Sequence, residues 1–249
     1  MDFSLIFISL AGLVGGFVGA QVGAGALITL PALLFLGLTP TLAIGTNILS
    51  GWLINVVAVF KYWKNHKINF RIVLPLSIIS LIGAFIGANL VLDINKEILS
   101  KIVAIFFFGL IFLIFKKPSA GLEIENKKLN RKDFIIAGIL CFILGIYGGF
   151  FSVGVATFLI FLFVLLLGRD LMQGIADSVF VTAIMLIAAL FVFVRRDNID
   201  FSLAVPLAIT SMVGSYIGAH TALKFGDKWL RGLLIVVVIA LIIKLLFNL

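Results

Sequence analysis

The glycine-rich run from Gly15 to Ala26 is the segment of this chain most suited to binding chemistry. Glycine at this density lets a helix break, or lets its backbone approach a neighbouring helix closely. A break near Gln21, Gly23 and Gly25 would leave backbone N–H groups at the positive end of a half-helix, where they bind an anion without a buried Lys or Arg. The other interpretation is tight packing of helices through small residues.

A second run of the same kind covers residues 145–157. Each run is followed by a polar spot within apolar sequence, at residues 43–47 and 174–178. Paired breaks in corresponding places of a membrane protein indicate a binding site, although hydroxyls and amides in such helices often only satisfy neighbouring backbone. The residues that we expect to bind substrate are Gln21, Gly23, Gly25, Thr46, Asn47, Ser152, Gly154 and Ser178.

Asp177 is the one acidic residue that lies well within an apolar stretch. An isolated carboxylate at the bilayer centre costs about 3 kcal/mol, so something must compensate for it. Asp177 is expected to be protonated, to pair with Arg169, to cap the N-terminus of a half-helix, or to carry a coupling H⁺ or Na⁺. His220 is the second candidate for a proton-linked role, against the plainer interpretation of an interfacial residue.

The elements that position these residues occur twice in the sequence. Residues 68–92 match residues 199–223 at a constant offset of 131, with 11 of 25 positions identical and no gap. The identities include Pro75 with Pro206 and Gly83 with Gly214. An internal repeat in a membrane protein is typical of a transporter whose two halves move about a shared central site.

The composition predicts an all-α polytopic membrane protein, because 63% of the residues are hydrophobic and only 12% are charged. We expect a first repeat at 1–115, a charged cytoplasmic linker at 116–133 and a second repeat at 134–249, each repeat with four to five transmembrane or re-entrant helices. Loop charge barely separates parallel from inverted repeats. We favour inverted repeats, with five segments per half and an external N-terminus. The expected segments are 3–20, 24–37, 42–61, 72–92, 98–115, 134–149, 151–167, 172–194, 202–221 and 230–247.

Several other functions fit the sequence poorly. The net charge of +8 arises from Lys and Arg in short loops, which the positive-inside rule explains without nucleic acid. One Cys and two His offer little for a metal centre, and we expect neither a cofactor nor enzyme activity. A membrane scaffold without transport is the alternative, and it predicts continuous helices. The aromatic residues that we expect to be interfacial anchors are Trp52, Tyr62, Trp63 and Trp229.

Four motifs recur in order along the chain: Gly16 to Pro31, Gly45-Thr46-Asn47, Gly145 to Phe151 and Leu165 to Leu171. This arrangement resembles the TauE/SafE sulfite exporter family, also called TSUP, over nearly the whole chain. The resemblance implies a multi-pass protein of the cell (plasma) membrane that transports a small sulfur-containing anion such as sulfite, a sulfonate or a related organic acid. It leaves open the substrate, the direction, the coupling ion and whether the chain forms a homo-oligomer.

Overall fold

The computed structural model describes residues 3–65, 67–93 and 130–246, and within these ranges all regular structure is helical. The fifth predicted segment and most of the predicted linker lie outside the described residues. The helices are α1 (Phe3–Val22), α2 (Ala26–Phe35), α3 (Pro40–Lys64), α4 (Phe70–Asp93), α6 (Arg131–Phe150), α7 (Val155–Phe161) with the π-helical turn η1 (Leu162–Leu166), α8 (Leu171–Arg195) and α9 (Phe201–Leu246).

Six of these helices are long and apolar enough to cross a membrane: α1, α3, α4, α6, α8 and the first part of α9. The apolar helix α2 and the helix formed by α7 with η1 are shorter. At about 1.5 Å per residue, the ten residues of α2 cover about half of a hydrocarbon layer of roughly 30 Å. The prediction of an all-α polytopic membrane protein is confirmed in this coarse form, because the regular structure of the described residues is helical and six helices could cross a membrane.

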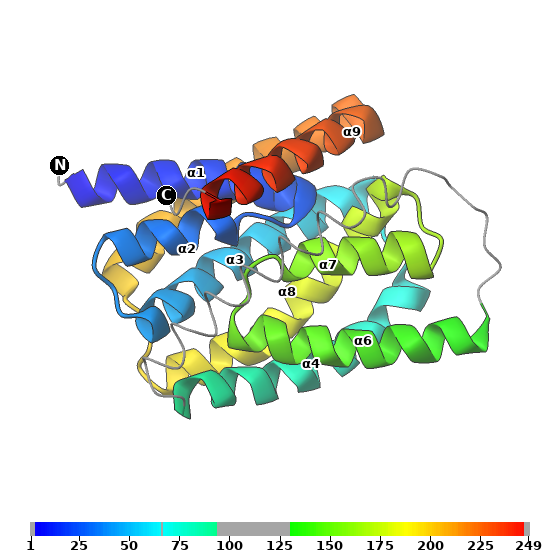
Figure 1. Ribbon diagram of the computed structural model, residues 1–249, viewed down its shortest axis with the longest axis horizontal. Helices are drawn as coiled ribbons and strands as arrows, with labels where there is room; N and C mark the ends of the chain where they lie inside the picture. Colours follow the sequence, from blue (N-terminus) through cyan, green and yellow to red (C-terminus); the bar gives the residue numbers. More distant parts are fainter. Residues whose placement is uncertain (1–2, 66, 94–129, 247–249) are drawn as a thin grey trace.

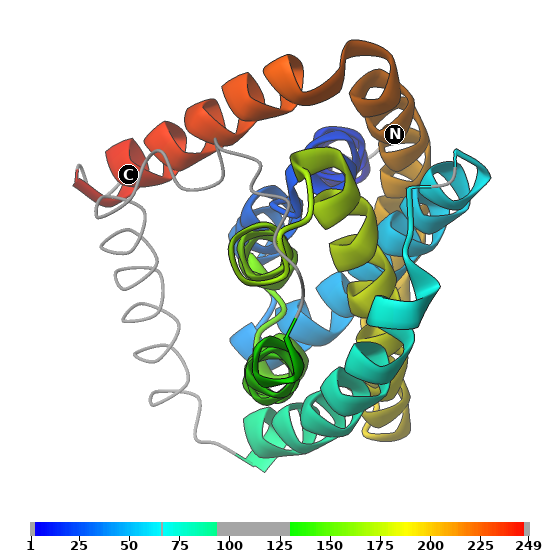
Figure 2. The same cartoon turned by 90° about the vertical axis from the view of Figure 1, so that its right-hand side faces the viewer.

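The helices run back and forth along one axis (Figure 1). Helix α1 leads away from the N-terminus, α2 folds back beside it, and α3 and α4 follow in opposite directions. Helix α6 points opposite to α1, and α7 again folds back toward the end where the preceding helix began. Viewed from that end, α6 lies beside α4 at the edge of the described helices, and α7 lies between α6 and α1 (Figure 2).

Helices from different parts of the chain pack together most closely. Helix α1 lies against α9, and α4 lies against α6. The close approach depends on glycine, because a Cβ at Gly16 would overlap the carbonyl oxygen of Ser211 and one at Gly87 would overlap that of Ile146. The packing interpretation of the glycine runs therefore holds for their helical part.

Helix α9 changes direction at Gly226, whose φ of 66° and ψ of −160° are open to glycine and costly for other residues. The sequence predicts two segments here, at 202–221 and 230–247. The structure has both, joined by this kink into one continuous element. The last part of α9 therefore turns back toward the end where α1 begins (Figure 1), and it reaches away from the other described helices (Figure 2).

Replacing Gly87 with Ala should lower the stability of the detergent-solubilised protein by about 1–3 kcal/mol, because the added methyl group would push α4 away from α6. Gly51→Ala is the matched control, since the nearest atom to its Cβ would be Leu186 Cδ1 at 3.7 Å. The control should be neutral or stabilising. Equal apparent melting temperatures for the two variants would contradict this account of the helix contact.

Candidate functional site

The first interruption of helical backbone separates α1 from α2. Helix α1 ends at Val22, and Gly23 has a φ of 73°, in the left-handed region that favours glycine. Thr29 on α2 donates a hydrogen bond to Asn47 Oδ1 on α3 (2.5 Å) and also lies 3.2 Å from the carbonyl oxygen of Gly25. The predicted break is thus present, and it brings Gly25 and Asn47 together through Thr29.

The second interruption separates α6 from α7. Helix α6 ends at Phe150, and both Ser152 (φ 62°) and Gly154 (φ 71°) have left-handed backbone. Ser152 is buried, and a residue other than glycine in this conformation carries strain. Tyr147 compensates part of the broken helix by donating its hydroxyl to the carbonyl oxygen of Val153.

The two interruptions are in direct contact. Thr157, in the first turn of α7, donates from Oγ1 to the carbonyl oxygen of Val22 at the end of α1 (2.7 Å). A Cβ at Gly23 would lie 2.6 Å from Ala156 Cβ, so the backbone of one interruption presses against the start of α7. The chain therefore places two stretches of non-helical backbone side by side within the bundle.

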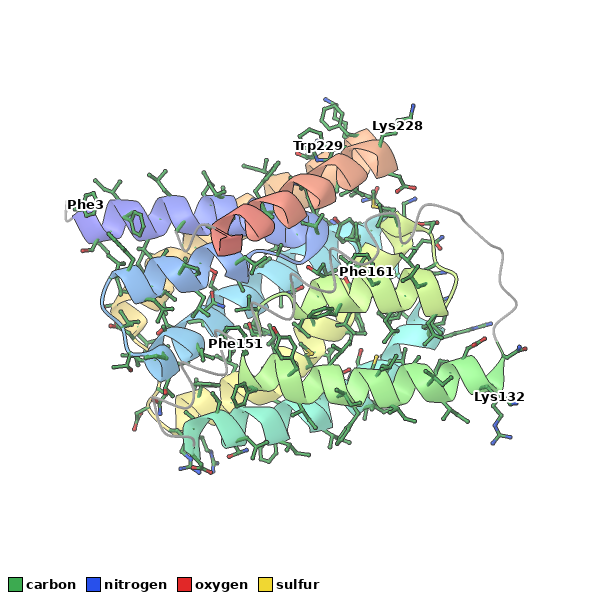
Figure 3. All side chains as sticks on the ribbon, in the orientation of Figure 1. Phe3, Lys132, Phe151, Phe161, Lys228 and Trp229 are labelled. Carbon is green, nitrogen blue, oxygen red and sulfur yellow. The ribbon has the colours of Figure 1, made fainter. Side chains whose placement is uncertain are left out.

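Gln21 is buried and fully engaged with neighbouring groups. Its Nε2 donates to the carbonyl oxygen of Phe17 (3.1 Å), and its Oε1 accepts from Trp229 Nε1 (2.5 Å). Trp229 lies just beyond the kink of α9, where Figure 3 labels it beside Lys228. No motif indicates this pair, because the two residues are 208 positions apart in the sequence.

Thr46 and Asp177 make the same kind of contact in corresponding places. Thr46 Oγ1 accepts the backbone N–H of Asp200 (3.0 Å), just before α9, and Asp177 Oδ1 accepts that of Asn69 (2.8 Å), just before α4. Helix α3 thereby holds the loop before α9, and α8 holds the loop before α4, so each contact joins the two halves of the chain. Asp177 Oδ2 also pairs with Arg169 Nε at 2.7 Å, which is one of the expected ways to compensate the buried acid.

The remaining candidates, Ser178 and His220, form no hydrogen bond with the interruptions in the described part of the chain. Asp170, rather than Asp177, caps α8 by accepting from the backbone N–H of Gln173 (2.7 Å). Ser178 donates to the carbonyl oxygen of Ile175 within its own helix (2.8 Å). His220 is exposed on α9. Within the described ranges, no group of three or more His, Cys, Asp or Glu side chains is arranged to hold a metal ion.

Two of the expected interfacial anchors are placed differently. Tyr62 is fully buried and donates to the carbonyl oxygen of Ala20 (2.9 Å), which ties α3 to α1. Trp52 lies midway along α3, packed against the largest apolar cluster rather than at a helix end. Trp63, near the end of α3, is 54% exposed, as an anchor requires. The anchor prediction is therefore wrong for Tyr62 and Trp52.

Replacing Asp177 with Leu should destabilise the protein by about 3–5 kcal/mol, because it leaves a mostly buried Arg169 without its partner. Thr46→Val, which removes one neutral acceptor at the corresponding place, should cost only about 1 kcal/mol.

The double variant Arg169→Leu/Asp177→Leu should recover most of the loss, since it leaves no unpaired buried charge. Thermal unfolding of purified protein in detergent measures all three variants. Equal stability of Asp177→Leu and Thr46→Val would show that the ion pair contributes no more to stability than the hydrogen bond of Thr46.

Comparison with known proteins agrees with this architecture. The family model described as sulfite exporter TauE/SafE matches residues 8–245. The chain is 27% identical over 244 residues to the probable membrane transporter protein ORF9 of Sinorhizobium sp., covering 98% of this chain and 93% of the relative. It is 25% identical over 238 residues to the probable membrane transporter protein YfcA of Escherichia coli K12, covering 95% and 87%.

No solved structure gives a significant match to the chain. The family match nevertheless covers both interruptions, five of the six long apolar helices of the described residues, and α1 from residue 8 onward. The chain therefore belongs to the sulfite exporter TauE/SafE family of membrane transporters.

Proposed function

We propose that this protein is a secondary transporter of small anions, of the sulfur-containing class that the family name indicates, and that it works by alternating access in the plasma membrane. The observation that carries the proposal is the contact between the two interruptions, where Thr157 reaches Val22 and Gly23 presses against Ala156. Non-helical backbone is tolerated at membrane depth only where protein buries it or where it lines a cavity. Continuous helices, which a passive scaffold would need, are not what this region contains.

The binding groups that we propose lie on both sides of this contact. In the link between α6 and α7, the N–H groups of Phe151 and Val153 already donate to the carbonyl oxygens of Tyr147 and Phe151. The binding donors that we propose are the remaining backbone N–H groups that lead into α2 and α7. Asn47 adds a side-chain amide from α3, held in place by Thr29. An oxyanion bound there would be stabilised by neutral donors and by a helix dipole, without a positively charged residue.

We also propose that the two halves are inverted repeats. Helices α3 and α8 are both 25 residues long, and their first residues are 131 positions apart, the offset of the sequence repeat. The opposite directions of α1 and α6 in Figure 1 support an inverted relation. So does the paired anchoring by Thr46 and Asp177, in which each half holds a loop of the other.

The direction of transport that costs least is export. Lys132 and Lys228 lie at the same end of the bundle in Figure 3, which the positive-inside rule assigns to the cytoplasm. Because the cell interior is negative, an anion that leaves gains about 2.3 kcal/mol per charge for each 100 mV. Export therefore needs no coupling ion, whereas import needs a co-transported cation.

Replacing Asn47 with Leu should reduce anion flux into liposomes at least tenfold, since the side chain keeps its size but loses its polar groups. Sulfite, thiosulfate, short sulfonates and carboxylates would be tested in parallel. Asn55→Leu, on the same helix, is the control, because Asn55 only donates back to the carbonyl oxygen of Gly51 (2.7 Å). Normal flux in the Asn47 variant would remove that residue from the site.

Replacing Asp177 with Asn tests whether a cation is coupled to transport. Both carboxylate oxygens have protein donors, in Asn69 and Arg169, which accounts for the buried acid without a bound ion. If Asp177 also carries H⁺ or Na⁺, the variant should lose the dependence of flux on pH or sodium. If the dependence of flux on pH and sodium is unchanged, anchoring of the loop before α4 is the one role that remains for Asp177.

A further inference from the structure

Trp52 carries a buried polar atom that nothing in the described part of the chain satisfies. Its indole Nε1 is the one buried side-chain nitrogen or oxygen there without a hydrogen-bond partner. The other two tryptophans differ, since Trp63 is largely exposed and Trp229 donates to Gln21. An unpaired buried donor costs about 1–3 kcal/mol, which Phe at the same place would avoid.

Trp52 lies near the middle of the membrane-spanning part of the bundle. It lies midway along α3 (Pro40–Lys64), about 18 Å of helix from either end and so near the middle of a membrane. Its ring packs against the apolar cluster that contains Ile48 of α3, Leu30 of α2 and both Phe151 and Val153 of the second interruption. Trp52 therefore shares one apolar cluster with residues of the elements that border the proposed anion site.

The fold itself does not require a donor at this position. The residue of α8 at the offset of 131 from Trp52 is Ala183, which is buried and has no polar side chain. An indole N–H is a donor only, so its partner must be an acceptor. In an apolar surrounding, a neutral donor favours a bound oxyanion without adding a compensating charge.

We propose that Trp52 Nε1 donates a hydrogen bond to an oxygen of the transported anion and selects for oxyanions, an assignment that rests on the proposed function. In the state described here the donor is shielded, and movement of the halves exposes it to the substrate. A hydrogen bond to a charged group contributes more than one between neutral groups, so its loss should be visible in the affinity.

The first test is Trp52→Phe in liposomes, with sulfite, ethanesulfonate and acetate as probes. The KM of the best-transported anion should rise about tenfold or more, while the melting temperature stays equal or increases because an unpaired N–H is removed. Trp63→Phe, on the exposed face of the same helix, should change neither quantity. An unchanged KM in the Trp52 variant would overturn the assignment.

The second test observes the N–H directly. The chain has three tryptophans, so the spectrum of ¹⁵N-indole-labelled protein in detergent should show three N–H signals, and Trp52→Phe identifies one by its disappearance. Adding the transported anion should shift that signal downfield and leave the Trp63 signal in place.

The outcomes separate the two proposals. Transport or binding by the wild type with no shift at Trp52 would refute this inference alone, as would a Trp52 variant that loses stability but keeps its KM. Failure of the wild-type protein to transport or bind any of the three probes would refute the proposed function, and this assignment with it.

Discussion

The structure depends on one constraint: a helix that breaks inside a membrane must find new partners for its freed carbonyl groups. Two hydroxyl groups meet this need at the interruptions, since Thr157 donates to the carbonyl oxygen of Val22 and Tyr147 to that of Val153. Each of these bonds satisfies an acceptor. Several backbone donors there are also bonded, Gly23 N–H to Gly19 and those of Phe151 and Val153 to Tyr147 and Phe151. A ligand that brings its own acceptors would therefore use the donors that remain at the starts of α2 and α7.

Close packing around this region explains why the breaks do not collapse the bundle. Glycines at intervals of four residues, such as Gly83 and Gly87, let α4 lie on the backbone of α6, and Gly214 and Gly218 let α9 lie on α1 in the same way. These contacts use almost no side-chain volume and therefore hold the helix pairs rigidly. Helices α3 and α8, which carry the polar groups, pack against these two helix pairs.

The breaks and the segment order followed from the sequence, because glycine spacing and apolar length act over a few neighbouring residues. Contacts between distant helices did not. Gln21 was expected to face substrate, but whether Trp229 reaches it depends on the kink at Gly226 and on α9 lying against α1. Tyr62 and Trp52 were misjudged for a related reason: the rule for interfacial aromatics considers residue type, whereas their burial depends on which helix face the bundle covers.

Early helices of the chain pack against late ones, and this determines the order in which the bundle can assemble during synthesis. The glycine face of α4 is filled by α6, which the ribosome completes only after a further stretch of polypeptide, and the face of α1 waits for α9, near the end of synthesis. The early helices must therefore enter the bilayer with their narrow faces still covered by lipid. Folding is completed only when the late helices displace that lipid, so a translation product that stops after Asp93 lacks the partners of both glycine faces.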